Sequence, residues 1–286
     1  MTGVSGSGKT TLVLETLIPA LRAQAAGERL PSHVRWVDAE GIARANLIDA
    51  TPIGANVRST VATYADIHDE LRRAFARTPE AKAAGYKAGA FSYNTGALRC
   101  PTCDGTGSIS LDVQFLPDVE IVCPACRGSR YADAASHIHR EGKDGSLLTL
   151  PQLMDMSVDE AIDATLGLKK VQTRLQTLHD LGLGYLTLGE PTPALSGGEA
   201  QRLKLASEMG RVQDDAVFVF DEPTIGLHPL DVQVLLNVFD GLVAKGATVI
   251  VIEHDLDLIR NADYVIDMGP GGGGACLLYT SPSPRD

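Results

Sequence analysis

Residues 3–10 read Gly3-Val4-Ser5-Gly6-Ser7-Gly8-Lys9-Thr10, and this stretch decides the fold class. It matches the phosphate-binding pattern G-x-x-x-x-G-K-[ST]. Glycines let backbone N–H groups turn inward around phosphate oxygens, and the apolar helix expected over 11–21 points its positive end at the anion. A chance glycine-rich turn is the alternative, and the helix that follows argues against it.

This motif predicts ATP and Mg²⁺ as cofactors. Lys9 is expected to reach the β- and γ-phosphates, and the hydroxyl of Thr10 is expected to bind Mg²⁺. The residues of this stretch that we predict to contact ATP are Gly3, Ser5, Gly6, Ser7, Gly8, Lys9, Thr10 and Thr11.

A second motif consists of two carboxylates at the end of an apolar run. Residues 216–220 are continuously apolar, as in a buried parallel strand, and Asp221 and Glu222 follow. Asp221 is expected to hold Mg²⁺. Glu222 is expected to be catalytic by polarising the attacking water as a general base. An ordinary acidic turn is the alternative, which the phosphate-binding motif disfavours.

A third motif, Leu195-Ser196-Gly197-Gly198-Glu199-Ala200-Gln201, begins a helix pattern. A Ser-Gly-Gly turn offers a hydroxyl, unhindered backbone N–H groups and a helix N-terminus to an anion. Alone, it could be an ordinary helix start with Ser196 as the N-cap. Together with the first two motifs, it predicts that Ser196, Gly197 and Gly198 contact ATP.

Four of the five cysteines form two CxxC pairs, Cys100/Cys103 and Cys123/Cys126, which are separated by 19 residues. Four thiolates at this spacing suit a tetrahedral Zn²⁺ ion. No coordination position stays open in such a set, so the predicted zinc site is structural. Two unlinked pairs of free cysteines are the alternative.

Composition limits the class of protein. The chain has 286 residues, 44% of them hydrophobic, and a net charge of −11. Because it has no run of about 18 apolar residues and no signal-peptide pattern, we expect a soluble, cytoplasmic protein without a membrane partner. The acidic balance argues mildly against nucleic-acid binding. Between Leu71 and Arg99, six basic residues face one acidic residue, Glu80, and a solvated helix face is the simpler explanation.

Periodicity predicts an α/β fold with a parallel sheet, because strands and helices alternate at both ends of the chain. The middle of the chain is helical and carries the cysteines, so it is predicted to be an insertion. We predict strands over 34–37, 216–220, 248–252 and 264–266. We predict helices over 11–21, 66–84, 158–166, 169–181, 199–209 and 231–243.

The order of these motifs resembles the ABC ATPase superfamily. In that resemblance, Ser196-Gly197-Gly198 is the signature that touches the γ-phosphate bound by an opposing module. Asp231 falls in the D-loop and is implied to contact ATP. His254 falls at the switch histidine, which implies a catalytic contact with the γ-phosphate.

The combination with the cysteines is similar to the UvrA family of excision-repair ATPases, from about Gly3 to about Gly274. The runs that carry the resemblance are Phe91-Ser92-Tyr93-Asn94, Cys100-x-x-Cys103-x-Gly105-x-Gly107, Phe115-Leu116-Pro117-Asp118-Val119, Cys123-x-x-Cys126-x-Gly128, Leu195–Arg202 and Asp221-Glu222-Pro223-Thr224-x-Gly226-Leu227-His228. Transporter ATPases lack the cysteine insertion.

The resemblance implies an ABC-type P-loop nucleotide-binding core with an inserted helical signature subdomain and a four-cysteine zinc module. The implied domains are residues 1–58 and 212–274 for the ATP-binding core, 59–211 for the signature subdomain and 97–131 for the zinc module. Residues 275–286 do not resemble the family and are left out of the fold prediction.

The function implied is ATP-dependent recognition of DNA damage in nucleotide excision repair. Implied partners are double-stranded DNA with lesions, a UvrB-like protein bound through another part of the family's chain, and a second copy in a homodimer. Arg127, Arg130 and Lys143 are candidate phosphate contacts near the zinc module.

The sequence departs from the family pattern in ways that leave other functions open. The family's glutamine loop reads Asp-Gln-Ser-Pro-Ile-Gly, whereas Ala50 stands second in residues 49–54, so hydrolysis is expected to be slowed or differently coupled. A single module also needs a second one to complete an ATP site. The alternatives are a UvrA-like paralogue in antibiotic resistance, the ATPase of a transporter, and a zinc-dependent DNA-binding protein without turnover.

Overall fold

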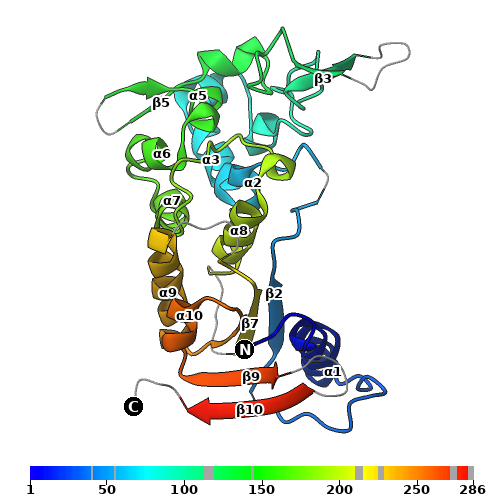
Figure 1. Cartoon of the computed structure of the whole chain (residues 1–286). Coiled ribbons are helices and arrows are strands. Elements are labelled where there is room, and N and C mark those ends of the chain that lie inside the picture. Colours follow the sequence, from blue (N-terminus) through cyan, green and yellow to red (C-terminus); the bar gives the residue numbers. More distant parts are fainter. Residues whose placement is uncertain are drawn as a thin grey trace. The chain divides into compact units, whose positions relative to one another are not determined.

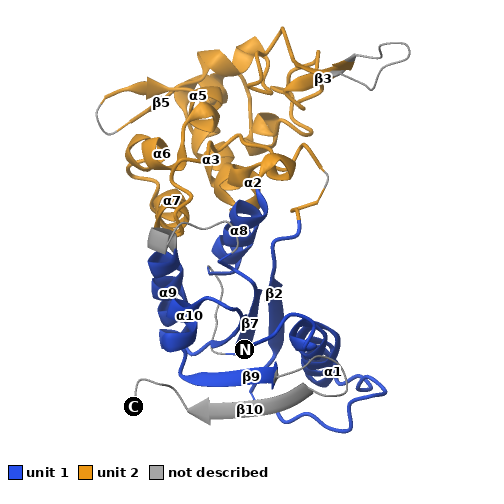
Figure 2. Ribbon diagram, in the orientation of Figure 1, with its two compact units in different colours: residues 1–51, 196–286 blue, residues 52–195 orange. Residues whose placement is uncertain are grey.

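A computed structural model describes residues 1–39, 41–54, 56–111, 119–142, 145–209, 215–224, 229–270 and 276–282. The chain forms two compact units (Figures 1 and 2). The first contains residues 1–51 and 196–286, and the second contains residues 52–195. Each unit is considered separately below.

The first unit is built on parallel strands. β7 (Ala216–Asp221) lies between β2 (Arg44–Ile48) and β8 (Thr248–Ile252) and is parallel to both. In this register Phe220 pairs with Ile48, and Asp221 pairs with Ile252. The apolar runs at 216–220 and 248–252 are therefore strands, as predicted.

A second set of strands is joined to this sheet through the N-terminal residues. β1 (Thr2–Gly3) is parallel to β9 (Tyr264–Pro270), and β10 (Cys276–Pro282) is antiparallel to β9. The Met1 amino group donates to the carbonyl of Val251 at 2.6 Å, and Glu253 N–H donates to the Met1 carbonyl at 3.0 Å. Residues 276–282, which the sequence analysis leaves out of the fold, are thus paired through their backbone.

Helices flank these strands in the first unit. A π-type helix, η1 (Thr11–Leu17), runs into α1 (Ile18–Ala26), and these cover the predicted helix at 11–21. The others are α8 (Gly197–Met209), α9 (Pro229–Ala244) and α10 (Leu256–Arg260). Val13, Ile18 and Leu21 pack with Val219 and Ile252 in one buried cluster, which fixes the glycine-rich turn against the strands.

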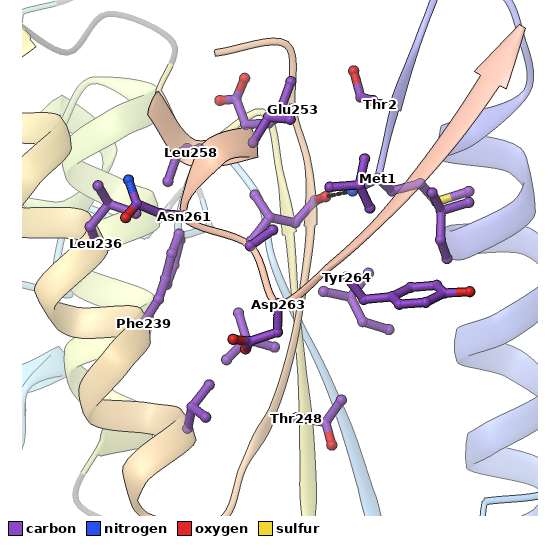
Figure 3. A pocket seen from close by; sticks show the side chains of 18 of the residues that line it. Met1, Thr2, Leu236, Phe239, Thr248, Glu253, Leu258, Asn261, Asp263 and Tyr264 are labelled. Atoms are coloured by element: carbon purple, nitrogen blue, oxygen red, sulfur yellow. Dashed lines mark hydrogen bonds between the residues drawn. The ribbon is translucent and has the colours of Figure 1, made fainter. Parts of the chain in front are cut away.

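A cavity of about 370 Å³ lies inside the first unit, between the sheet and helix α9 (Figure 3). Leu236 and Phe239 of α9 line one side, and residues 248–251 and 264–266 line the others together with Met1. β1 has only two residues, so it does not fill the space between β8 and β9. Among the described residues, the edges of β8 and β9 that line the cavity pair with no further strand. The cavity therefore belongs to the sheet and holds none of the predicted site residues.

The second unit is mainly helical. Its helices are α2 (Val61–Tyr64), α3 (Ile67–Phe75), α4 (Pro79–Ala83), η2 (Ala88–Phe91), η3 (Asp133–His137), α5 (Leu150–Asp155), α6 (Val158–Ala164), α7 (Lys169–Asp180) and η4 (Thr192–Ala194). Thr60, Thr149 and Ser157 each begin a helix with a capping box, which satisfies its free N–H groups. The predicted helices at 158–166 and 169–181 are confirmed.

Two hairpins complete the second unit. β3 (Ser108–Leu111) pairs with β4 (Val119–Val122), and β5 (Arg140–Glu141) pairs with β6 (Leu147–Leu148), both antiparallel. The first hairpin joins the two CxxC pairs, so the chain returns to place them side by side.

Two sequence predictions of secondary structure were wrong. Residues 34–37 form no strand, and Trp36 is 74% exposed. The strand at that edge of the sheet is β2, where Arg44 pairs with Asp215 at 2.5 Å next to the start of β7. The predicted helix at 66–84 is two helices, because Thr78 caps a new helix whose first residue is Pro79.

The described residues contain no helix long and apolar enough to cross a membrane. The compact units place α8 with the core, whereas the sequence analysis assigns residues 59–211 to a signature subdomain. That division and its boundaries stay a prediction.

Gly3 is expected to tolerate no side chain. Its φ is +133°, and a Cβ would lie 2.0 Å from the carbonyl oxygen of Met268 in β9. Gly3→Ala should lower the free energy of unfolding by about 3 kcal/mol or more, measured by urea denaturation. Gly27→Ala is the control, because φ is +67° there but a Cβ meets nothing within 4 Å, so the loss should be about 1 kcal/mol. Equal losses would contradict the assigned role of the β9 contact.

Candidate active site and metal centre

The glycine-rich turn places its lysine inside the loop. Lys9 is 6% exposed, and its ammonium group donates to the carbonyls of Gly3 and Val4 at 2.9 and 3.0 Å. Gly6 and Gly8 have φ values of +78° and +89°, which only glycine adopts without strain. The Ser7 hydroxyl is buried and has no hydrogen-bond partner among the described residues. The turn thus offers a buried cation and a free hydroxyl to an anion.

The two carboxylates lie at the carboxyl end of β7. Glu222 has a φ of +47°, so it leaves the strand in a left-handed conformation, and its N–H donates to the Ile252 carbonyl at 2.9 Å. Its carboxylate lies 4.0 Å from Nε2 of His254, and both side chains are about half exposed. The structure therefore brings together the two residues predicted to be catalytic.

The pKa of Asp221 is raised by its surroundings. Burial raises its pKa, and the neighbouring carboxylates of Glu222, Asp49 and Glu253 raise it further, while Lys9 opposes them. Carboxylates gathered in this way favour a bound cation, because a cation relieves their mutual repulsion.

A buried carboxylate, Glu253, orders the loops around this site, and the sequence analysis missed it. It is 5% exposed and accepts hydrogen bonds from the backbone N–H groups of Thr224, His254 and Asp255, and from the Thr224 hydroxyl. One side chain thus ties the turn after β7 to the turn after β8. Its position directly before His254 was the only sequence signal.

The third motif begins α8 with the expected cap. The Ser196 hydroxyl accepts from Glu199 N–H at 3.3 Å, and the Glu199 carboxylate accepts from Ser196 N–H at 2.7 Å. Ser196 and Gly197 are exposed, so the helix N-terminus is accessible. The ordinary cap and the predicted anion contact are compatible, because backbone N–H groups of the first turn have no partner within the helix.

Helix α8 also holds the loop that contains Ala50. The ammonium group of Lys204 donates to both the carbonyl and the carboxylate of Asp49, and to the carbonyl and hydroxyl of Thr51. A Cβ on Gly197 would lie 3.1 Å from that of Ala50. Burial raises the pKa of Asp49, but the hydrogen bonds from Lys204 and Thr51 outweigh it and leave the pKa below its ordinary value. The sequence analysis did not single out Lys204.

Some predicted residues lie partly or wholly outside the described structure. Asp231 lies in α9, but its side chain is not described. Gly226-Leu227-His228, Lys143 and most of Phe115–Val119 lie outside the described residues.

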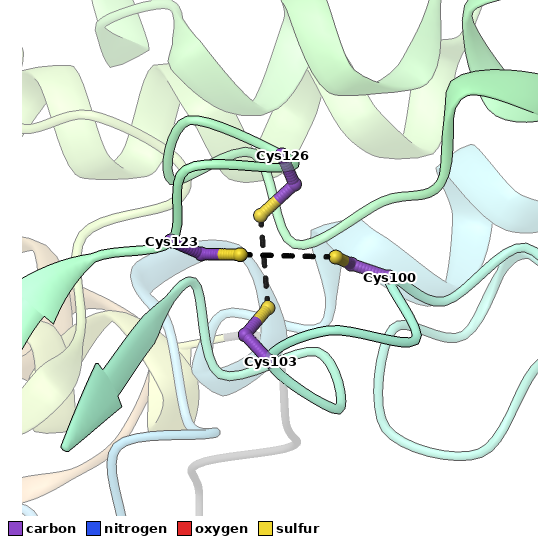
Figure 4. Close-up of side chains that lie close together, drawn as sticks. All are labelled: Cys100, Cys103, Cys123 and Cys126. Carbon is purple, nitrogen blue, oxygen red and sulfur yellow. Dashed lines mark hydrogen bonds between the residues drawn. The ribbon is translucent and has the colours of Figure 1, made fainter. Parts of the chain in front are cut away.

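The four predicted metal ligands come together in the second unit (Figure 4). The sulfurs of Cys100, Cys103, Cys123 and Cys126 all lie within 4.8 Å of one another. The Cys100–Cys123 and Cys103–Cys126 pairs are 3.9 and 3.6 Å apart, too far for disulfides. Burial and the neighbouring thiols raise the pKa of Cys126 to about 12. A cation at the centre would reverse that shift, because thiolates bind metal ions.

Polar residues join the cluster to the segment that precedes α2. Asp104, directly after Cys103, accepts from Arg58 through its carbonyl at 2.7 Å and its carboxylate at 2.9 Å, and pairs with Arg99 at 2.7 Å. Arg130 donates to the Val57 carbonyl at 3.0 Å. Residues 57 and 58 are therefore hydrogen-bonded to the segments that follow each of the two CxxC pairs.

Arg130, a predicted phosphate contact, is buried in this structure, and its role stays a prediction. It is 5% exposed, and its guanidinium lies 5.3 Å from the centre of the Tyr93 ring. Arg127, the other described candidate, is exposed with a φ of +51°. Its role stays a prediction.

Comparison with known proteins decides the family. No protein-family model matches the chain. The UvrABC system protein A of Mycobacterium tuberculosis is 45% identical over 290 residues, covering 100% of this chain and 29% of that protein. The Bacillus subtilis protein of the same name is 44% identical and is covered to 30% of its length. The crystal structure of UvrA2 from Deinococcus radiodurans superposes with a TM-score of 0.86 at 42% identity, over 98% of this chain and 34% of that one.

This chain belongs to the UvrA family. It spans about three-tenths of the length of the curated UvrA relatives that it matches. The superposition with UvrA2 also confirms the predicted fold class, an α/β ABC ATPase fold that carries a four-cysteine cluster. Membership in the UvrA family explains why ATP-site motifs and CxxC pairs occur in one chain.

In this UvrA-family chain, a buried histidine near the cysteine cluster should make stability depend on pH. Nε2 of His68 lies 2.8 Å from the Tyr131 hydroxyl, and burial, with Arg72 second, lowers the pKa of His68 from 6.5 to about 3. Folding therefore favours the neutral ring. The contribution of the neutral His68 ring to the free energy of unfolding is complete above pH 6.5. It is lost as the pH falls toward 3, by about 1.4 kcal/mol per pH unit.

His68→Gln should remove this part of the pH dependence, measured as the free energy of unfolding between pH 7 and 4. The control is His179→Gln, since His179 is exposed and paired with Asp159 at 2.7 Å in the same unit. A wild-type profile that matches the His68→Gln profile would contradict the assignment.

Proposed function

We propose that the chain is an ATP-binding and ATP-hydrolysing module of a UvrA-like protein that recognises DNA damage in nucleotide excision repair. The observation that carries this proposal is the convergence of Lys9, Asp221, Glu222 and His254 in a chain 45% identical to UvrABC system protein A throughout its length. Such a protein acts on DNA in the cytoplasm.

ATP is proposed to bind in the glycine-rich turn. Lys9 would exchange the carbonyls of Gly3 and Val4 for the β- and γ-phosphates. The unpartnered Ser7 hydroxyl and the backbone N–H groups up to Thr11 would donate to phosphate oxygens. The fit is good because the turn holds a buried cation and a buried free donor.

Thr10 and Asp221 are proposed to hold Mg²⁺. Burial, and next the nearby carboxylates, raise the pKa of Asp221, so these residues fit a divalent cation. Bound there, the ion would neutralise charge on the phosphates.

Glu222 is proposed to orient and deprotonate the attacking water, while His254 contacts the γ-phosphate. Their separation of 4.0 Å leaves both side chains free to approach a substrate. Glu253 would act as a positioning residue, because it fixes the backbone of His254 and Thr224. The positive φ of Glu222 turns its side chain away from the strand line.

A complete site requires two modules in this proposal. Ser196, Gly197, Gly198 and Asp231 would contact ATP bound by an opposing module, which is a second copy of the chain or another part of the family's longer protein. The exposed N-terminus of α8 is available for such a contact.

The cysteine cluster is proposed to bind one structural Zn²⁺. A tetrahedral site with zinc–sulfur bonds of about 2.3 Å has sulfur–sulfur edges of about 3.8 Å. The separations of 3.9 and 3.6 Å fit that tetrahedron. The further partners proposed are double-stranded DNA with lesions and a UvrB-like protein.

Glu222→Gln is the first test of the proposal. The variant should bind ATP and Mg²⁺ like the wild-type chain, but steady-state turnover should fall about 100-fold or more, since general-base catalysis contributes about 10² to 10⁴. Glu28→Gln, an exposed change in the same unit, is the control. Each protein should also be tested with ATP for competition between damaged and undamaged duplex DNA. No turnover above the Glu222→Gln level, measured where a second module is present, would refute the ATPase. Equal binding of both duplexes would refute damage recognition.

Metal removal is the second test. One zinc ion should be measured per chain, and a strong chelator should release it and unfold the cluster, because structural zinc contributes folding energy directly. Cys123→Ser, at a fully buried ligand, should lose the metal, while Ser108→Ala, near the cluster, should keep it. Full zinc content in Cys123→Ser would refute the four-cysteine site.

A further inference from the structure

A basic hollow of about 440 Å³ lies in the second unit, and none of the four clustered cysteines lines it. It is formed where α3 ends, where α4 ends and where η2 begins. Four cations line it: Arg73, Arg77, Lys82 and Lys87. These residues account for most of the local basic excess in a chain whose net charge is −11.

The charge in the hollow is only partly compensated. Arg73 pairs with Glu70 at 2.8 Å, whereas Arg77, Lys82 and Lys87 form no ion pair among the residues that the structure describes. The C-terminal ends of α3 and α4 supply about half a negative charge each, which favours some basic residues there. Glu70 is shared with Lys170 at 3.6 Å, so it cancels at most one of the four positive charges. With about one more for the two helix ends, an excess of about two or more remains.

The frame of the hollow is rigid. Thr78 caps α4 by accepting from Ala81 N–H, and Tyr86 N–H donates to the Ala81 carbonyl at 2.8 Å. The half-buried ring of Tyr86 packs edge-on against the fully buried Phe91 at 6.5 Å. The wall is therefore fixed, while the charged ends of the four cationic side chains reach solvent. This arrangement suits an extended polyanion better than an enclosed single ion.

We infer that this hollow binds the phosphodiester backbone of duplex DNA. The inference rests on the proposed function, and it uses exposed cations, whereas Arg130 is buried. The cations contact phosphates without reading bases, so the site positions DNA and does not select its sequence.

The test compares the triple variant Arg77→Gln, Lys82→Gln and Lys87→Gln with the wild-type chain. Each phosphate contact contributes about 0.9 to the slope of log affinity against log salt concentration. The variant should lower that slope by about 2.7 and weaken binding equally for damaged and undamaged duplexes. Thermal unfolding and ATP turnover should match the wild-type values.

The matched control is Arg29→Gln, Lys169→Gln and Lys245→Gln, which removes three exposed charges that lie outside the hollow. A control slope that falls as far as that of the triple variant would overturn the inference, because it would show a net-charge effect. Weaker polyglutamate binding by the triple variant, with unchanged DNA binding, would also overturn it and point to an acidic protein partner.

The outcomes separate this inference from the proposed function. If the wild-type chain binds DNA and the triple variant has the same slope of log affinity against log salt concentration, only the inference about the hollow is overturned. A folded, zinc-loaded wild-type chain that binds no duplex DNA overturns both.

Discussion

The parallel pairing of β7 with β2 on one side and β8 on the other is the constraint on which the site depends. Ile48 pairs with Phe220, and Asp221 pairs with Ile252. Parallel strands end at the same edge, so the residues that follow them meet although they are far apart in sequence. Asp49, Glu222 and Glu253 are neighbours for this reason.

Hydrogen bonds then convert this proximity into defined geometry. Glu253 organises the backbone after β7 and β8, and Lys204 does the same for residues 49 and 51 after β2. A buried carboxylate that accepts several N–H bonds holds the backbone that donates them. The catalytic candidates Glu222 and His254 can therefore remain half exposed while the turns that carry them are fixed.

Local sequence patterns were sufficient for much of this. The glycine-rich turn, the apolar runs of β7 and β8, and the four cysteines each depend on a few adjacent residues, so motif spacing predicted their fold and their grouping. Strand β2 was missed because its limits depend on pairing with β7 and on the Arg44–Asp215 ion pair, which joins residues 171 positions apart. The roles of Glu253 and Lys204 were missed for the same reason. The burial of Arg130 was not predicted, because its sequence neighbours do not show its contacts with Val57 and Tyr93.

The basic residues of the second unit form two sets with different contacts. Arg58, Arg99 and Arg130 are used internally, where they hold residues 57–58 and Asp104 around the cysteine cluster. Arginine suits that task because its planar fork can donate to a carbonyl and a carboxylate together. Arg77, Lys82 and Lys87 instead keep exposed ends on a rigid frame. The first set is engaged in contacts that hold the cluster, although Arg58 and Arg99 stay partly exposed, whereas the second set has charged ends with no ion pair among the described residues.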